Sequence, residues 1–431
     1  MKRFTAALAL VVAACAAALS ATPALAAGGP ALGQPCTKAG QMTGLGPGKS
    51  AVCARSKGKL VWTQLKDQGK PQPGQQAPKG KAPGTTTGAA PAGAGASSSS
   101  PSCDPASVRF TANIMDPASV AFVTPIGGQT GSGGVVAVRS YVSPLRSLAG
   151  QRVPIMAPVD MTLTGAAHYK LPQAPASYQP EYSLYFSGPC GLDVKFFHVK
   201  ALAAKLESVV PAAVSPSSAG NPVSSPLAVK AGEVIGYWIG GGESVAFDFW
   251  VDNPRVTNAF ITPERYGRSN YLHAVCPYAF YAEPLRSTWL NKLASQGGTI
   301  VPGTPCGTVS QGKLGTALGQ WFLIKDPAQG QTDVISYDGT YMSQAIISLE
   351  ADRTVRIGGF WSPGYILVGA SDPTWADPSS VTTGKSQCWF DRSSNRSLSV
   401  VLDSATQMRV AVTDGPCPSP VDASAWKTYY R

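Results

Sequence analysis

The chain has 431 residues, of which 44% are hydrophobic, and a formal net charge of +11, and its length suggests more than one domain. Residues 27–82 carry nine lysines and arginines against one aspartate, and Lys2 and Arg3 add two charges, so the rest of the chain has a net charge of only +1. An almost neutral main body lacks the broad basic surface on which nucleic-acid-binding proteins depend, and we expect no nucleic-acid partner.

The first residues have the pattern of a secretory signal peptide. Lys2 and Arg3 precede an apolar, alanine-rich run that ends in the Ala-x-Ala site Ala24-Leu-Ala26. This pattern predicts that residues 1–26 are a signal peptide, removed after Ala26, and that the protein is secreted. Cys15 ends the run Val12-Ala-Ala-Cys15, which also fits a lipoprotein processing site, so lipid anchoring is an alternative.

The next two segments differ in composition. Residues 27–65 contain Cys36, Cys53 and the strand-like Lys59–Leu65, and predict a small basic segment stapled by a disulfide. Residues 66–102 consist mostly of Pro, Gly, Ala, Ser, Thr, Gln and Lys, which is typical of a disordered linker. In an exported protein, the basic residues 27–82 are expected to attract an anionic wall or membrane surface, or simply to keep a flexible arm soluble.

From Cys103 onward the sequence predicts a mainly β protein. Short apolar runs alternate with Gly and Pro, and only Val199–Val210 has a helical pattern. We divide this part into a first β-sheet domain (103–258), a connecting segment (259–305) and a C-terminal β-rich domain (306–431), which would be a barrel or a sandwich.

One stretch of the first domain predicts a hairpin. Two strands, Val234–Ile239 and Ser244–Val251, are separated by the glycines 240–242, which take up the positive φ angles of a turn. The second strand alternates, with Phe247, Phe249 and Val251 on one face, so we expect Asp248 to project from the opposite face.

Five motifs of this domain occur in a recognisable order: Pro154-Ile-Met-Ala-Pro-Val-Asp160, Tyr182-Ser-Leu-Tyr-Phe186, Val194-Lys-Phe-Phe-His198, Val229-Lys-Ala-Gly-Glu-Val-Ile-Gly236 and Val245-Ala-Phe-Asp-Phe-Trp-Val251. Over residues 110–255 this order resembles the lysostaphin-type zinc endopeptidases (peptidase M23-like, with a duplicated hybrid motif). The resemblance implies the β-sheet core of that family, and a wall peptide as the class of substrate.

The resemblance also implies that the zinc chemistry has been lost. The family binds zinc through a His-x-x-x-Asp pair and a His-x-His strand, yet here Ala246 and Asp248 lie where the two histidines of that strand would be. Residues 134–146, which would contain the first pair, have neither His nor Asp and include Arg139. His198 matches an accessory catalytic position of the family rather than a metal ligand.

The residues themselves support the same conclusion. A catalytic zinc needs about three protein ligands, but the mature chain has only His168, His198 and His273, far apart and outside any His-x-His or His-Glu-x-x-His motif. An atypical site built from Asp248, His198 and one more distant residue remains the alternative. Paired acids of a glycosidase are a further option, with four candidates that more often solvate strand ends: Asp193, Glu243, Asp248 and Asp252.

The C-terminal domain offers aromatic side chains that would either stack on sugar rings or fill a β core: Trp321, Trp361, Tyr365, Trp375 and Trp389. The cysteines bear on all domains, because an even set in an exported chain without Cys-x-x-Cys favours disulfides over metal thiolates. We expect Cys36 to pair with Cys53 and Cys388 with Cys417, which leaves an undefined pairing among Cys103, Cys190, Cys276 and Cys306.

The sequence therefore predicts an exported cell-envelope protein that is not catalytic and uses no cofactor. Its peptidase-like groove would bind a cell-wall peptide, a glycan or a protein partner. The alternative is a zinc metallopeptidase that acts on cell-wall peptides. The groove candidates are Arg139, Tyr141, His198, Asp248 and Trp250.

Overall fold

The computed structural model describes residues 34–35, 42–46, 49–56, 59–64, 103–128, 136–171, 174, 177–240, 245–266, 269–325, 337–338, 341–342, 344–360 and 365–431. The chain divides into two compact units, Met1–Gly95 and Ala96–Arg431. Several predictions lie outside the described residues: the signal peptide, Cys15, the linker 66–102, and the pairing of Cys36 with Cys53.

The first unit contains a three-stranded antiparallel sheet of β1 (Met42–Gly46), β2 (Lys49–Ser56) and β3 (Lys59–Gln64) among its described residues. β2 and β3 form a hairpin in which Ser56 lies opposite Lys59 and Cys53 opposite Trp62. The predicted strand Lys59–Leu65 is confirmed by β3, whose Leu-Val-Trp-Thr run has a high preference for a pleated sheet.

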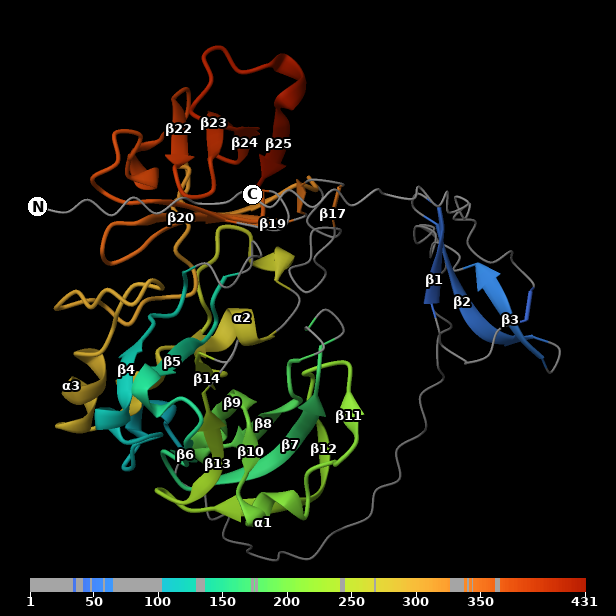
Figure 1. Cartoon of the computed structure of the whole chain (residues 1–431), viewed down its shortest axis with the longest axis vertical. Helices are drawn as coiled ribbons and strands as arrows, with labels where there is room; N and C mark the ends of the chain where they lie inside the picture. The colour runs from blue at the N-terminus through green and yellow to red at the C-terminus, as the bar shows by residue number, and fades with distance from the viewer. Residues whose placement is uncertain are drawn as a thin grey trace, which may run out of the picture. The chain divides into compact units, whose positions relative to one another are not determined.

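The first domain of the second unit is built from two sheets (Figure 1). In the part of the chain that the structure describes, the larger sheet has the strand order β11-β7-β8-β9-β14-β5-β4, with β12 paired to β7 and β15 to β14. Its strands are β4 (Val120–Val123), β5 (Ser140–Pro144), β7 (Met161–Tyr169), β8 (Glu181–Ser187), β9 (Asp193–Val199), β11 (Val214–Ser215), β12 (Asn221–Val229), β14 (Phe247–Asp252) and β15 (Ala274–Val275).

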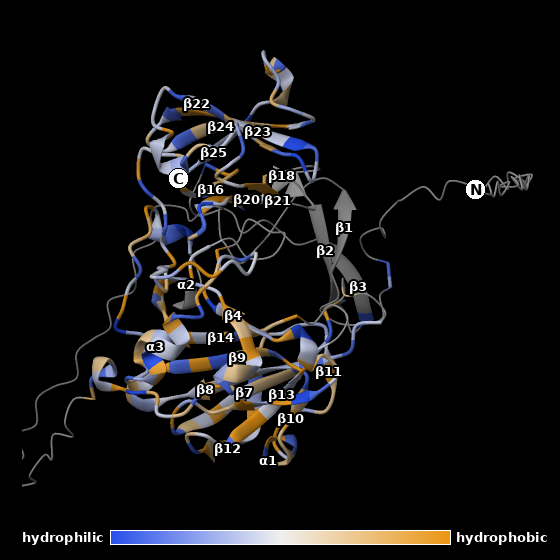
Figure 2. Ribbon diagram, turned by 60° about the vertical axis from the view of Figure 1, so that its left-hand side comes forward, coloured by the Kyte–Doolittle hydropathy of each residue, from blue (hydrophilic) through white to orange (hydrophobic). Residues whose placement is uncertain are grey.

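The smaller sheet has the order β10-β13-β6 and comprises β6 (Arg152–Met156), β10 (Ala201–Leu202) and β13 (Val234–Ile239). Both sheets contribute to one apolar core, which includes Ile155 and Trp238 from the smaller sheet and Phe196 and Phe249 from the larger. Apolar strands such as β4 appear orange in Figure 2. Burial of these faces is the main favourable term that holds the domain together.

The predicted hairpin is wrong, although both of its strands exist. β13 pairs with β6 and β10, whereas β14 pairs with β5, β9 and β15. All six residues of β14 are buried, so this strand belongs in the middle of a sheet that is covered on both faces. A Cβ atom on Gly236 of β13 would lie 2.6 Å from the Val199 side chain, which explains why glycine occupies this crossing of the two sheets.

The helical pattern over Val199–Val210 is only partly confirmed. Helix α1 covers Ala204–Glu207, while Val199 ends β9 and Ala201–Leu202 form β10. Sheet pairing of the first residues takes precedence over their helical periodicity. The connecting segment contains α2 (Ser269–His273) and α3 (Leu285–Leu290).

Over its described residues, the C-terminal domain is a nearly closed antiparallel barrel of eight strands. Of the two predicted architectures, a barrel or a sandwich, the structure therefore confirms the barrel. The strand order is β21-β20-β19-β16-β25-β24-β23-β22, and Leu367 of β21 donates its backbone N–H to the Asp391 carboxylate of β22 at 3.3 Å. Its strands are β16 (Gly319–Phe322), β19 (Gln344–Leu349), β20 (Val355–Gly358), β21 (Tyr365–Val368), β22 (Ser386–Asp391), β23 (Arg396–Ser404), β24 (Gln407–Asp414) and β25 (Lys427–Tyr430), beside a separate pair, β17 (Tyr337–Asp338) and β18 (Tyr341–Met342).

Three disulfides lie within the described residues and settle the pairing that the sequence left open. They are Cys103–Cys190, Cys276–Cys306 and Cys388–Cys417, the last of which was predicted from proximity. Disulfides of this kind form and persist in an oxidising environment such as the extracellular space. Among the described residues, no helix has the length and apolar character needed to cross a membrane.

A second apolar cluster joins the first domain, the connecting segment and the barrel. Trp250 of β14 belongs to it, together with Tyr266 of the connecting segment and Phe322 of β16. The fully buried Arg265 donates to the carbonyl oxygens of Ile324 at 3.0 Å and Lys325 at 2.9 Å. The connecting segment is therefore packed against both domains and covers part of the larger sheet.

Candidate functional site

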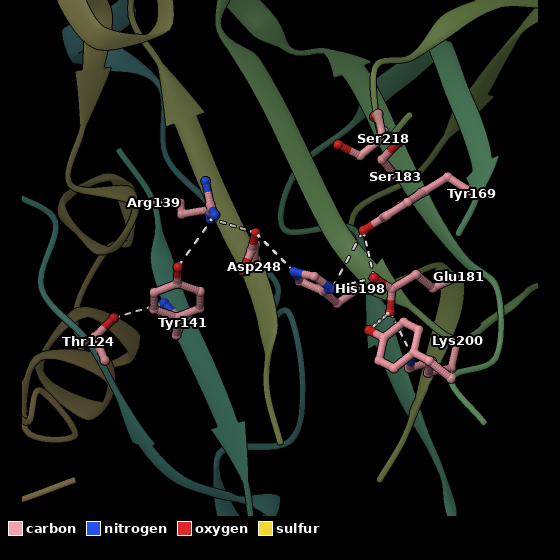
Figure 3. Close-up of polar contacts among 11 residues, drawn as sticks. Thr124, Arg139, Tyr141, Tyr169, Glu181, Ser183, His198, Lys200, Ser218 and Asp248 are labelled. Atoms are coloured by element: carbon pink, nitrogen blue, oxygen red, sulfur yellow. Dashed lines mark hydrogen bonds and ion pairs between the residues drawn. The ribbon is translucent and has the colours of Figure 1, made fainter. Parts of the chain in front are cut away.

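A row of charged side chains crosses neighbouring strands of the larger sheet (Figure 3). Arg139 directly precedes β5, Asp248 lies on β14, His198 on β9, Glu181 at the start of β8, and Lys200 just after β9. We call these five residues the polar row. Because β5, β14, β9 and β8 are consecutive in the sheet, residues more than 100 positions apart in the sequence are brought into contact.

Arg139 and Asp248 form the first contact of the row. The Arg139 Nε lies 2.6 Å from the Asp248 Oδ2, and the Asp248 side chain has no exposed surface. By its distance this contact is an ion pair, but the Arg139 Nε–H does not point toward the carboxylate and makes no hydrogen bond with it. Neither Asp248 oxygen has a hydrogen-bond donor among the described residues. Burial lowers the pKa of Arg139, but Asp248, Tyr141 and Tyr271 together raise it by more, so Arg139 stays charged.

His198 occupies an irregular position on β9. Its φ angle is +62°, in the left-handed region, and the pairing of β8 with β9 shifts between Leu184 and Tyr182. Phe197 lies opposite Asp248 on β14, so a regular strand would turn His198 to the other face of the sheet. The bulge instead keeps His198 beside Asp248, with His198 Nε2 3.8 Å from Asp248 Oδ2.

The other ring nitrogen of His198 faces Glu181. His198 Nδ1 lies 2.5 Å from the Glu181 Oε1. Burial lowers the pKa of His198, but Asp248 and the hydrogen bond to Glu181 raise it by more, so the pKa lies above its usual range. In its protonated form, which the raised pKa favours, the imidazolium bridges the carboxylates of Asp248 and Glu181 and holds the middle of the row together.

Glu181 is the most completely paired member of the row. It is buried and also accepts hydrogen bonds from the Tyr169 hydroxyl at 2.7 Å, the Tyr178 hydroxyl at 2.6 Å and the Lys200 Nζ at 2.6 Å. Burial raises the pKa of Glu181, but these partners and His198 lower it to about 2. Glu181 is thus ionised at any physiological pH.

Four residues of this site are not among those predicted from the sequence: Glu181, Lys200, Tyr169 and Tyr178. Acidic residues are scarce in this domain, and Glu181 stands at the start of an apolar strand. A lone acid in that position could have indicated a member of the polar site. Its partners could not be inferred, because they depend on the pairing of Tyr169 with Glu181 and of Tyr182 with Val199 across three strands.

Two basic residues of the row, Arg139 and His198, are partly exposed to solvent, and its two acidic residues lie below them. The side chains of Arg139 and His198 are 24% and 31% exposed, whereas those of Asp248 and Glu181 are 0% and 1% exposed. A ligand at this surface would therefore meet hydrogen-bond donors and positive charge.

The structure brings together four of the five groove candidates and places the fifth beneath them. The Arg139 guanidinium lies 5.5 Å from the centre of the half-buried Tyr141 ring and donates to its hydroxyl at 3.4 Å. Trp250 is buried in the second apolar cluster, where its ring centre lies 5.9 Å from the same guanidinium and its Nε1 donates to Asp252 at 2.7 Å. Trp250 thus supports Arg139 from within instead of presenting a ring to a ligand.

The residues present do not fit a zinc ion. The position beside the Asp248 carboxylate is taken by the Arg139 guanidinium, and the Nδ1 of His198 is already engaged by Glu181 at 2.5 Å. The other two histidines face backbone carbonyl oxygens elsewhere: His168 faces Ala212, and His273 faces Val256. Within the described ranges, no cluster of three His, Cys, Asp or Glu side chains has the arrangement of a metal site.

The structure also places other candidates from the sequence, among the glycosidase acids and the C-terminal aromatic residues. Asp252 is ion-paired with Lys195 at 2.5 Å, while Glu243 lies outside the described residues. Of the C-terminal aromatics, Trp321 and Trp389 fill the barrel core, which confirms the core alternative for these two. Trp375 is half-buried, Tyr365 is 40% exposed, and Trp361 lies outside the described residues.

Fold and site together define a disulfide-linked protein of two β domains with a charged row across the central sheet of the first domain. The chain matches no family model, no curated protein and no solved structure. The resemblance to lysostaphin-type peptidases therefore depends on the sequence motifs alone.

Proposed function

We propose that this chain is an exported cell-envelope protein whose first domain is a degenerate lysostaphin-type domain that binds a wall component at the polar row without cleaving it. The observation that carries the proposal is the Arg139 guanidinium, which lies 2.6 Å from Asp248. In the family that the motifs resemble, a zinc histidine stands at the position of Asp248, so an organic cation replaces the metal at this carboxylate.

The state of His198 supports binding over hydrolysis. A general base must accept a proton from water, and the raised pKa of His198 makes its neutral form less abundant than in a free histidine. His198 also uses its Nδ1 for Glu181, which fixes the ring. The side chain is therefore equipped to donate to a ligand rather than to activate a nucleophile.

The partly exposed donors of Arg139 and His198 favour a ligand rich in acceptor atoms. Wall peptides carry carboxylates and amide oxygens, which match the donors of Arg139 and His198. The basic residues 27–82 would add attraction to an anionic wall or membrane surface. Two contacts in one chain would retain the protein at the envelope more firmly than either contact alone.

The test is retention on purified wall sacculi, measured as the bound fraction of the full secreted chain at low and at high salt. R139Q is expected to reduce retention about tenfold, the effect of losing one charge-assisted hydrogen bond. R139K keeps the charge but loses the planar fork and should show an intermediate value. K230Q removes a solvent-exposed lysine of the same domain, 79% exposed, and should bind as the unaltered chain does.

Zinc content and clearing of wall suspensions complete the test. One equivalent of tightly held zinc, together with chelator-sensitive clearing, would establish the metallopeptidase alternative instead. Retention that is unchanged by R139Q would remove the polar row from the binding site.

A further inference from the structure

His198 contacts its two acidic neighbours through different ring nitrogens (Figure 3). Its Nδ1 lies 2.5 Å from the Glu181 Oε1, within hydrogen-bond distance, whereas its Nε2 lies 3.8 Å from the Asp248 Oδ2, beyond that distance. Nε2 has no hydrogen-bond partner among the described residues, and it is not one of the fully buried polar atoms. The ring is therefore held at one nitrogen and open at the other.

Glu181 decides which ring nitrogen keeps a proton. With its pKa lowered to about 2, Glu181 is an ionised carboxylate, which can only accept hydrogen bonds. Nδ1 is therefore the donor of this hydrogen bond both in the imidazolium and in the neutral ring. The Tyr169 hydroxyl, 3.5 Å from Nδ1, offers it no proton, because this hydroxyl donates to Glu181 at 2.7 Å. The proton that His198 loses on titration is thus the proton on Nε2.

The charged groups around the ring set the pH at which this proton leaves. Among the described residues, those that face His198 are Glu181 of β8, Asp248 of β14 and Arg139 before β5. Burial and Arg139 lower the pKa of His198, but the two carboxylates raise it by more, so the ring loses its charge above the usual pH of about 6.5. The other Glu181 oxygen, Oε2, accepts from two further titratable side chains, Lys200 and Tyr178.

The open nitrogen reverses its role when the proton leaves. The imidazolium presents an Nε2–H that donates, whereas the neutral ring presents a lone pair there, which only accepts. Arg139 stays charged and continues to donate. Arg139 and His198 both contact the same Asp248 oxygen, Oδ2, and both side chains are partly exposed, so one ligand group can meet both of them.

We propose that Glu181 is a positioning residue that keeps the titrating proton of His198 on Nε2, and that the polar row binds a carboxylate only while this proton is present. The proposal rests on the proposed function of the row as a binding site. A carboxylate accepts from Arg139 and from the Nε2–H, but after deprotonation its oxygen faces a lone pair on an uncharged ring. Because only the protonated fraction binds, affinity should fall about tenfold for each pH unit above the pKa of His198.

Nuclear magnetic resonance on the full chain with ¹⁵N-labelled histidine tests the positioning role. The chain has only three histidines, and the signals that disappear in H198N identify His198. Asparagine suits this variant because it tolerates the left-handed φ of +62° at this position. At alkaline pH the nitrogen shifts should show a protonated Nδ1 and an unprotonated Nε2. The opposite tautomer, or an even mixture of the two, overturns the role of Glu181.

Binding of N-acetylalanine, followed at the His198 signals between about pH 6 and 9, tests the carboxylate site. Its dissociation constant should rise about tenfold per pH unit above the measured pKa of His198, and H198N should bind it alike at each pH. N-acetylalaninamide should change less, because its NH₂ group can donate to the neutral ring. N-acetylglutamic acid α-amide carries the carboxylate on a side chain: whichever acid binds more tightly assigns a chain terminus or a side chain as the natural group. No binding of either acid, or an affinity independent of pH, overturns the proposal.

The sacculus assay separates this proposal from the proposed function. Retention that depends on Arg139 but has the same pH profile in H198N leaves wall binding in place and overturns the pH dependence. Probe binding that follows the protonation of His198, without retention on sacculi, overturns wall binding and supports the carboxylate site. K230Q alters an exposed lysine outside the polar row and should keep both the tautomer and the pH dependence.

Discussion

Two aspartates at sheet positions show how differently the two domains use a buried carboxylate. Asp391 of the barrel accepts hydrogen bonds from the Ser393 N–H at 2.8 Å, the Ser393 and Ser394 hydroxyls at 2.6 and 2.9 Å, and the Leu367 N–H at 3.3 Å. Asp248 of the first domain is more deeply buried but is held by charge, with no hydrogen bond from the described residues.

The difference separates a structural role from the binding role that we propose for the polar row. Burial raises the pKa of Asp391, but its hydrogen bonds lower it by more, and the same bonds fasten the edge of β22 to β21. The two Asp248 oxygens accept no hydrogen bond from the described residues, although they lie below the partly exposed side chains of Arg139 and His198. Unused polar capacity in a buried position costs stability, and proteins retain it mainly where a ligand or a switch needs it.

The largest expected effect comes from the best-paired carboxylate of the row. E181Q keeps the shape of Glu181 but leaves Lys200 without its counter-charge and His198 with Asp248 alone, so we expect a loss of about 3 kcal/mol in the free energy of unfolding. Urea denaturation followed by tryptophan fluorescence measures it. A loss below about 1 kcal/mol would show that Glu181 is not the anchor of the row.

A smaller loss is expected at the barrel. D391N turns two acceptor atoms into one acceptor and one donor, so at least one of the donors that Asp391 serves loses its partner. We expect about 2 kcal/mol of destabilisation by the same denaturation method. Hydrogen exchange should show faster opening at Leu367, and an unchanged exchange rate there would refute the fastening of β21 to β22.

D248N should cost less, about 1 kcal/mol, because no hydrogen bond is lost and the partly exposed Arg139 can regain water. The double variant R139Q/D248N, compared with the two single variants, gives the coupling energy between the residues. A destabilisation by D248N that equals or exceeds that of D391N would reverse the contrast between the two aspartates.

The smallest effect is a pH dependence of stability. Because the folded pKa of His198 is raised, its contribution is fully present below the unfolded value of about 6.5 and is lost as pH rises through the folded value. Glu181 behaves in the opposite sense, since its folded pKa is about 2: its contribution is present above its unfolded value of about 4.3 and is lost as pH falls toward 2. Melting temperatures between pH 5 and 9 should fall on the alkaline side in the parent chain and stay flatter in H198Q. The same slope in both proteins would contradict a charged His198.

The β class, most strand positions and the Cys388–Cys417 pair follow from local patterns, and the sequence predicts them. Strand alternation also places Asp248 off the aliphatic core, whereas its proximity to Arg139 is implied by the resemblance of the motifs and not by local patterns. Glu181 does not follow, since three of its four partners, all except the nearby Tyr178, come together only through long-range strand pairing. The bulge at His198 cannot be predicted, because the surrounding residues alternate as in a regular strand. The central position of β14 cannot be predicted either, because it depends on the distant residues that cover the second face of this strand.

The Cys103–Cys190 disulfide also has a mechanical consequence. It connects the first described residue of the second unit to the short turn between β8 and β9, two strands that carry Glu181 and His198. If the N-terminal residues are held at a surface, tension arriving at Cys103 passes through a covalent bond into the middle of the sheet instead of peeling an edge strand. The protein would then resist pulling by shear across several strands, and reduction of this one bond would lower the force that it withstands.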